Sequence, residues 1–139
     1  MPGIVVGTDG SSGARAAVLE AAKLAGALKQ RVVVVSAYGA SAMAAVSPEA
    51  VAHAGDGRDA AEQALKSAGD DLAGAGVEFD VRAVNGGPAD AIVDVAKLED
   101  ADTIVIGSRG MRGARRLLGS VPNAVSHKAP CSVYIVRTD

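Results

Sequence analysis

The hydrophobic residues of this chain occur either in short uninterrupted runs or at helical spacing in longer stretches. Residues 4–6 and 32–35 consist only of Ile and Val, as expected for strands that are covered on both faces. Residues 77–84 instead alternate apolar and polar positions, which predicts a strand with one solvated face at a sheet edge. Between these runs, apolar residues recur every three or four positions and predict amphipathic helices.

The pattern predicts strands and helices in regular alternation along the chain. Because parallel strands need a crossover helix between them, the alternation predicts the α/β fold class, with a doubly wound, five-stranded parallel sheet. At 139 residues the chain is expected to form a single domain, residues 1–139. The strands are expected at residues 4–6, 31–37, 77–84, 103–107 and 132–136, and the helices from Ser11 or Ser12 to Leu28 and at residues 58–73, 88–100 and 120–128.

The composition indicates which residue types form the core and which classes of partner to expect. Hydrophobic residues make up 49% of the chain, but only Tyr38, Phe79 and Tyr134 are aromatic, so the core is expected to be aliphatic. The net charge of -2 gives no general attraction to nucleic acid or to an anionic membrane. Proteins that bind single-stranded nucleic acid stack its bases on aromatic side chains, and this chain has few of them. We therefore expect no nucleic-acid partner and no membrane partner.

The cysteine content and the length of the apolar segments indicate the compartment. Cys131 is the only cysteine, which excludes an intrachain disulfide and suits a reducing environment. It lies at the start of an apolar strand, where a small buried filler is expected rather than a nucleophile. No run reaches the ~18 apolar residues of a membrane span, and no leader peptide is evident. These observations predict a soluble, cytoplasmic protein.

The segment 103–121 carries the clearest chemical signal, because an apolar strand runs into a glycine-punctuated loop and then into a helix start. Gly107, Gly110 and Gly119 allow a ligand to approach the main chain closely. Amide groups at the start of the helix, with Ser120 as the expected N-cap, favour a phosphate there. The alternative is a strand-to-helix loop whose glycines only form turns. Four arginines add positive charge beside the loop: Arg109, Arg112, Arg115 and Arg116.

Three segments far apart in the sequence are expected to meet at one rim of the sheet. Ligands of doubly wound sheets bind at the carboxyl ends of the strands, where the connections reverse direction. Asp9, Ala37 and the loop after Gly107 all follow or end strands at that rim. Residues 38–57 predict a long loop, with a helical turn near residues 48–53, that leaves from the same rim. The sequence therefore predicts a ligand crevice there.

Residues 5–11, 36–38, 84–89 and 107–121 resemble the corresponding segments of the universal stress protein family. The resemblance covers essentially the whole chain, and the last of these segments is its most specific part. It implies a Rossmann-like domain of the adenine nucleotide alpha hydrolase-like type, with strand order 3-2-1-4-5. It also implies a homodimer, and membership of either a nucleotide-binding or a non-binding group.

The nucleotide-binding group has a glycine motif that this chain follows with one change. The family pattern is Gly, two residues, Gly, nine residues, and then Gly followed by Ser or Thr. Gly107, Gly110, Gly119 and Ser120 fit the pattern, but residues 111–118 form a spacer of eight. The shorter spacer implies a loop geometry that differs from that of the family.

Carried over by position, the resemblance implies that Asp9 hydrogen-bonds the ribose or supports a Mg²⁺ ion. On local sequence alone, Asp9 is equally suited to capping the first helix. The main chain near Ala37 would read the adenine edge, and the residues after the fourth strand would hold the ribose and the phosphates. The full set of implied nucleotide-binding residues is Thr8, Asp9, Ala37, Gly107, Ser108, Arg109, Gly110, Gly119, Ser120 and Val121.

The resulting hypothesis is an adenine-nucleotide-binding stress protein with a regulatory role, with ATP as the first candidate ligand and cAMP as the second. The chain lacks the Gly-x-x-x-x-Gly-Lys-Ser/Thr loop, and His53 and His127 have no obvious paired nucleophile. A phosphoacceptor receiver domain needs clustered acidic residues at the end of its first strand. Here Asp9 stands alone at that position, which disfavours this class of protein. No residue that would position an attacking water is evident, so at most a slow ATPase is expected.

A second hypothesis is a dimeric stress-response module that binds no nucleotide and acts through protein contacts. The strand at residues 132–136 is apolar and is expected at a sheet edge, where unpaired backbone groups invite a further strand. Pairing with the same strand of a second copy would form a homodimer. Because such pairing suits both hypotheses, retention of nucleotide on purification distinguishes them.

Overall fold

The computed structural model describes residues 3–39, 42, 57–108 and 118–138. The predicted alternation of strands and helices is confirmed, with most ends within two residues of the expected ones. Only Tyr38, Gly39, Ala42 and Gly57 of the expected long loop are described, so the helical turn expected near residues 48–53 lies outside the described residues. The elements are β1 (Ile4–Gly7), α1 (Ser12–Leu28), β2 (Val32–Tyr38), α4 (Arg58–Gly74), β3 (Phe79–Asn85), α5 (Pro88–Leu98), β4 (Thr103–Gly107), α6 (Ser120–Lys128) and β5 (Ser132–Val136).

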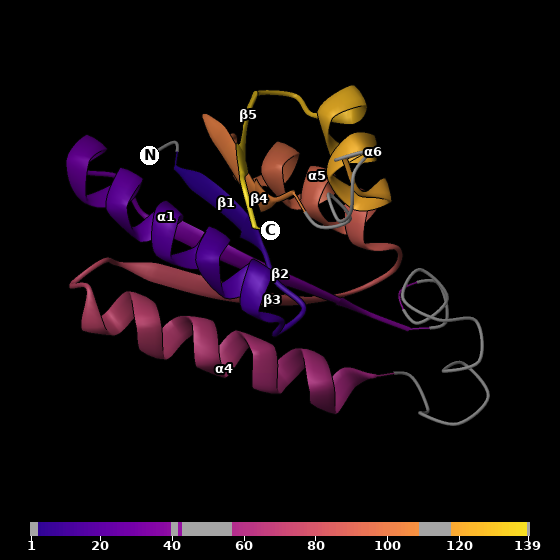
Figure 1. Cartoon of the computed structure of the whole chain (residues 1–139), viewed down its shortest axis with the longest axis horizontal. Helices are drawn as coiled ribbons and strands as arrows, with labels where there is room; N and C mark the ends of the chain where they lie inside the picture. Colours follow the sequence, from indigo (N-terminus) through magenta and orange to yellow (C-terminus); the bar gives the residue numbers. More distant parts are fainter. Residues whose placement is uncertain (1–2, 40–41, 43–56, 109–117, 139) are drawn as a thin grey trace.

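The five strands form one parallel sheet with the order β3-β2-β1-β4-β5, as expected (Figure 1). In the central register, Val6 of β1 pairs with Val34 of β2 on one side and with Val105 of β4 on the other. β3 and β5 are the two edge strands, which confirms the edge position predicted for each. The connections reverse direction between β1 and β4, so the carboxyl ends of these two strands flank the switch point.

Helices cover both faces of the sheet (Figure 1). Because successive side chains of a strand point to opposite faces, Val6 packs with α1 and α4, whereas Val5 packs with α5 and with Val125 of α6. Both clusters consist of Val, Ile, Leu and Ala side chains, so the expected aliphatic core is confirmed. In the described part of the chain, no helix has the length and apolarity needed to cross a bilayer.

The start of α6 corrects one expectation. Gly119, not Ser120, is the N-cap, with φ -63° and ψ 163°, and Ser120 is the first helical residue. A Ser120 hydroxyl cap would accept the N–H of the second or third residue after it, and the second, Pro122, has no N–H. Asn123 instead donates its N–H to the Gly119 carbonyl at 3.0 Å, which makes Gly119 the first acceptor of the helix.

The starts of the other helices agree with the sequence. Ser11, one of two candidates, caps α1, and its hydroxyl accepts the Ala14 N–H at 3.2 Å. Pro88 lies in the first turn of α5, as expected from its fixed φ.

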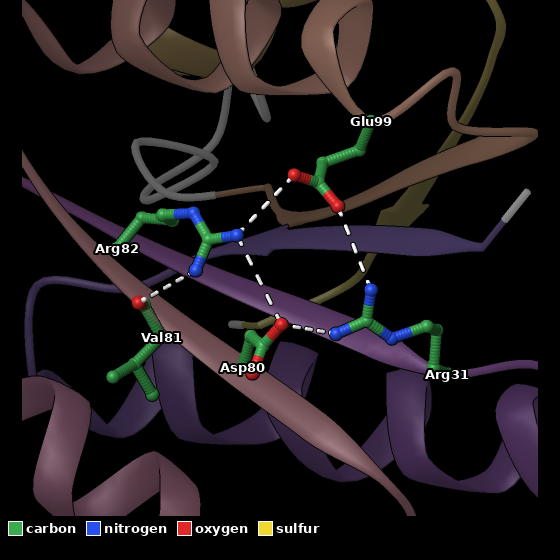
Figure 2. A network of polar contacts seen from close by, with 5 residues as sticks. All are labelled: Arg31, Asp80, Val81, Arg82 and Glu99. Atoms are coloured by element: carbon green, nitrogen blue, oxygen red, sulfur yellow. Dashed lines mark hydrogen bonds and ion pairs between the residues drawn. The ribbon is translucent and has the colours of Figure 1, made fainter.

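A polar network lies near the amino ends of β2 and β3 (Figure 2). Arg31, which precedes β2, pairs with Asp80 of β3 and with Glu99 after α5, the latter at 3.6 Å. Arg82 approaches the same Glu99 at 3.3 Å and Asp80 at 3.9 Å. Since these side chains are partly solvated, the network contributes modestly to stability. It ties the β3 edge to α5, away from the carboxyl ends of the strands.

Candidate functional site

A cavity of about 330 Å³ lies at the carboxyl ends of β1, β2 and β4, which is where the sequence places the crevice. Its apolar floor comes from Val35, Ile92 and Ile106, on β2, α5 and β4. Small side chains and main-chain atoms form much of the remaining lining of the cavity. Its other described lining residues are Gly7, Thr8, Asp9, Ser11, Gly13, Ala14, Ala37, Ala42, Pro88, Gly107, Gly119, Ser120, Val121 and Pro122.

The starts of three helices face this cavity. Gly13 lies in the first turn of α1, Pro88 in the first turn of α5, and Ser120 in the first turn of α6, and all three line the wall. The amino end of a helix carries a partial positive charge and N–H groups without intrahelical partners. Three such ends around one cavity create a field that favours an anion.

The amino end of α6 offers two donors to the cavity. Gly119 has no side chain to accept the N–H groups that follow it, so no side-chain cap is made here by the described N-cap residue. Pro122 has no N–H, and Asn123 already donates within the helix. Ser120 and Val121 both line the cavity, so their amides are the candidate donors there for a ligand oxygen.

The turn from β1 to α1 brings Asp9 to the same wall. One carboxylate oxygen of Asp9, Oδ1, accepts the N–H of Ser11 at 2.9 Å, and Thr8 Oγ1 accepts the N–H of Gly10 at 3.1 Å. Gly10 has φ +83°, a left-handed conformation that glycine adopts without strain. The carboxylate of Asp9 thus shapes the turn, while the cap of α1 is Ser11.

The expected site residues divide into three sets. Thr8, Asp9, Ala37, Gly107, Gly119, Ser120 and Val121 line the cavity together. Ser108 is 1% exposed, and its hydroxyl accepts the N–H of Thr138 at 3.0 Å. Arg109 and Gly110 lie outside the described residues, as do Arg112, Arg115, Arg116 and His53.

Comparisons with known proteins agree with this geometry. Residues 2–137 match the profile of the universal stress protein family. The chain belongs to this family. A universal stress protein of Mycobacterium tuberculosis strain H37Rv is 38% identical over 140 residues, covering 97% of this chain and 95% of the relative.

Two solved universal stress proteins contain nucleotides. A crystal structure of one in complex with cAMP has a TM-score of 0.76 to this chain at 33% identity, covering 99% of this chain and 98% of the other. The universal stress protein from Archaeoglobus fulgidus in complex with dAMP has a TM-score of 0.72 at 28% identity, covering 97% of each chain. The fold of this universal stress protein is thus shared by relatives that hold adenine nucleotides.

Sequence reasoning missed the cavity residues on α1 and α5. Gly13 and Ala14 of α1 and Pro88 and Ile92 of α5 line the wall, although none was expected to. Their positions in the sequence could have indicated this. Each lies in or just after the first turn of a helix that follows a strand ending at the carboxyl rim of the sheet. Ala42, which is buried, also lines the cavity.

Charged and metal-ligating groups are sparse in the described lining of the cavity. Among the described residues, no group of three or more His, Cys, Asp or Glu residues could hold a metal ion. Asp9 is the one ionisable residue among the described lining residues. Cys131 directly precedes β5, at the end of the sheet opposite the cavity. It is partly buried against the core beneath α5 and α6, and this burial raises the pKa of its thiol.

Proposed function

We propose that this universal stress protein binds an adenine nucleotide in the cavity at the carboxyl ends of β1, β2 and β4. The observation that carries the proposal is the amino end of α6, where Ser120 and Val121 line the cavity and Gly119 provides no side-chain cap. The cAMP and dAMP held by two similar proteins each combine adenine, a sugar and a phosphate. A phosphate is the anion that a helix amino end binds readily.

The remaining walls suit the other parts of a nucleotide. Gly107 lines the cavity at the carboxyl end of β4, beside the expected position of the sugar and phosphate. The Asp9 carboxylate can accept hydrogen bonds from ribose hydroxyls. The apolar floor, which includes Val35 and Ile106, suits the faces of adenine, and main-chain groups near Ala37 would read its edge. Thr8 completes the wall beside Asp9.

We propose ATP as the preferred ligand and cAMP as the alternative. When bound with ATP, Mg²⁺ would offset phosphate charge, and it commonly uses one or two protein carboxylates together with substrate phosphates and waters. The Asp9 carboxylate on the cavity wall fits such a shared site. We assign no catalytic residue, because no base besides Asp9 lies among the described lining residues, and any ATP hydrolysis is expected to be slow.

We further propose that the protein is a homodimer that pairs through residues 132–136. β5 is an edge strand, and its Tyr134 and Ile135 side chains are 40% and 37% exposed. The Tyr134 hydroxyl donates to Glu20 Oε1 at 2.9 Å, which raises its pKa above the usual range and holds the ring over α1. An exposed apolar edge is a site for pairing with a second chain.

This edge also favours a second candidate function. A dimer that acts through protein contacts in the stress response would need the β5 edge but not the cavity. The two functions differ in one measurable property, which is nucleotide affinity.

The test of nucleotide binding compares Ser120→Pro with Ser120→Ala. Proline is well tolerated at the first helical position, and the ψ of 163° at Gly119 suits a residue that precedes proline. Ser120→Pro therefore removes one amide donor while keeping the helix, whereas Ser120→Ala keeps the donor and removes only the hydroxyl. A hydrogen bond to a charged group contributes about 1.5–3 kcal/mol, so calorimetry should show a Kd for ATP raised roughly ten- to a hundredfold by Ser120→Pro.

Ser120→Ala is the control for the change in Kd that Ser120→Pro causes. Ser120→Ala should raise the Kd by less than about tenfold, and neither variant should change the free energy of unfolding by more than about 1 kcal/mol. Equal affinities of wild type and Ser120→Pro would show that the Ser120 amide does not hold the phosphate. A wild-type protein with no affinity for ATP, ADP, AMP or cAMP would instead favour the protein-contact function.

A further inference from the structure

Thr138, two residues after β5, packs between two glycines of the cavity wall. A Cβ atom on Gly13 of α1 would lie 3.2 Å from Thr138 Cβ and 3.4 Å from its Oγ1. A Cβ atom on Gly107 of β4 would lie 3.1 Å from Thr138 Cγ2 and 3.2 Å from the Gly13 carbonyl oxygen. The Thr138 side chain therefore fills a notch in which neither glycine has room for an unadjusted methyl group.

A buried serine fixes Thr138 in this notch. Ser108 and Ser36 are the two buried polar residues in the described part of the chain. The Ser108 N–H donates to the Val136 carbonyl at 2.8 Å, which continues the β4–β5 hydrogen bonds beyond the Gly107 and Val136 pair. The Ser108 hydroxyl accepts the Thr138 N–H at 3.0 Å and lies 3.3 Å from the Thr138 hydroxyl.

The two glycines that Thr138 touches belong to different walls of the cavity. Gly13 is in the first turn of α1, and Gly107 is the last residue of β4, at the switch point of the sheet. We propose that Thr138 is a positioning residue that sets the spacing of these two walls, and so the affinity of the nucleotide site. This inference rests on the proposed nucleotide binding, but the spacing of the walls can be measured without a ligand.

Three variants separate the shape of the side chain from its hydroxyl. Thr138→Gly empties the notch, whereas Thr138→Val keeps its shape and loses only the hydroxyl contact with Ser108. Because a small misplacement of binding groups is costly, Thr138→Gly should raise the Kd for ATP roughly tenfold or more. Thr138→Val should restore the affinity to within about threefold of wild type, and Thr138→Ser should fall between the two. Leu98→Ala, at an exposed position at the end of α5, is the control and should leave the Kd unchanged.

Amide hydrogen exchange reports on the walls themselves. Without nucleotide, Thr138→Gly should speed exchange at Ser108, bonded to Val136, and at Ala14, bonded to Ser11, while Ile4 and Val32 at the other end of the sheet stay as in wild type. Thr138→Val should return the exchange of both amides to the wild-type rate. A loss of overall stability would instead change all four amides together.

The outcomes separate this inference from the proposed function. If wild type binds no nucleotide, the proposed function fails, and exchange at Ser108 and Ala14 alone decides whether Thr138 positions the walls. Unchanged exchange at both amides in Thr138→Gly overturns the inference in every case. It is also overturned if wild type binds ATP and Thr138→Gly binds it equally well, or if Thr138→Val loses as much affinity as Thr138→Gly.

Discussion

Asp9 combines a structural and a proposed ligand role in a single side chain. Its Oδ1 accepts the Ser11 N–H at 2.9 Å, and the residue also lines the cavity. Removing the whole carboxylate would therefore confuse a loss of the turn with a loss of the ligand contact. A substitution that keeps the oxygen but removes the charge separates them.

We predict that Asp9→Asn keeps the turn and weakens the binding of ATP in the presence of Mg²⁺. The Asn side-chain oxygen can still accept the Ser11 N–H, so the free energy of unfolding should stay within about 0.5 kcal/mol of wild type. The lost charge no longer supports Mg²⁺, and calorimetry should show a Kd for ATP raised roughly tenfold with Mg²⁺ and less in EDTA.

Asp9→Ala is the matched comparison. It removes the acceptor as well as the charge and should lower the free energy of unfolding by about 1 kcal/mol in addition to weakening ATP. If Asp9→Asn bound Mg²⁺-ATP as tightly as wild type, the carboxylate would serve only the turn between β1 and α1.

At the scale of the elements, two helical glycines have opposite surroundings. Apart from the adjoining backbone of α1, no heavy atom of the described residues lies within 4 Å of the position that a Cβ on Gly26 would take. Gly69 in α4 is buried, and a Cβ there would lie 2.9 Å from the ring of Phe79 on β3. The first glycine only weakens its helix, whereas the second lets α4 approach the sheet.

We predict opposite signs for the same substitution at these glycines. Gly26→Ala should raise the free energy of unfolding by up to about 1 kcal/mol, because alanine favours the helix and restricts the unfolded chain. Gly69→Ala should lower it by about 1–3 kcal/mol through overpacking against Phe79. Urea denaturation of both variants measures this, and a stabilised Gly69→Ala would show that α4 shifts freely against β3.

The sequence predicts most elements because their signals are local. The Ile and Val runs and the Pro88 start of α5 need no tertiary information. The hydroxyl of Ser120 is a good cap by residue type, but the N-cap of α6 is Gly119, and Pro122 lacks one of the N–H groups that a Ser120 cap would accept.

The site is only partly predictable for a related reason. Asp9, Ala37 and Gly107 follow or end strands, so the parallel topology alone brings them to the cavity. Gly13 and Ile92 reach it only through the packing of α1 and α5 on opposite faces. Ser108, also predicted as a binding residue, is buried beside Thr138, and this contact with the segment after β5 is one that no local pattern encodes.

At the scale of the whole molecule, the two sheet edges differ. The β3 edge carries Asp80 and Arg82, which pair with Arg31 and Glu99 (Figure 2). Charged edges discourage pairing with another chain. The β5 edge exposes Ile135 and presents no such network among the described residues, so a second copy is expected there.

We predict that Ile135→Lys converts the proposed dimer into a monomer. A lysine on an edge strand opposes strand pairing, and two such charges would face each other across a symmetric interface. Light scattering after size exclusion should give the mass of two chains for wild type and of one for the variant, with an unchanged circular dichroism spectrum. Leu98→Lys, which changes an 83% exposed residue of α5, should stay dimeric. A monomeric wild type, or a dimeric Ile135→Lys, would contradict pairing through β5.

The peptide amides at the start of α6 do not ionise in the physiological range, unlike histidine or a thiol. Their contribution to the proposed phosphate binding should therefore persist when a cell acidifies. A nucleotide site that relies on these amides, as proposed, should keep its affinity while the pH of the cell changes.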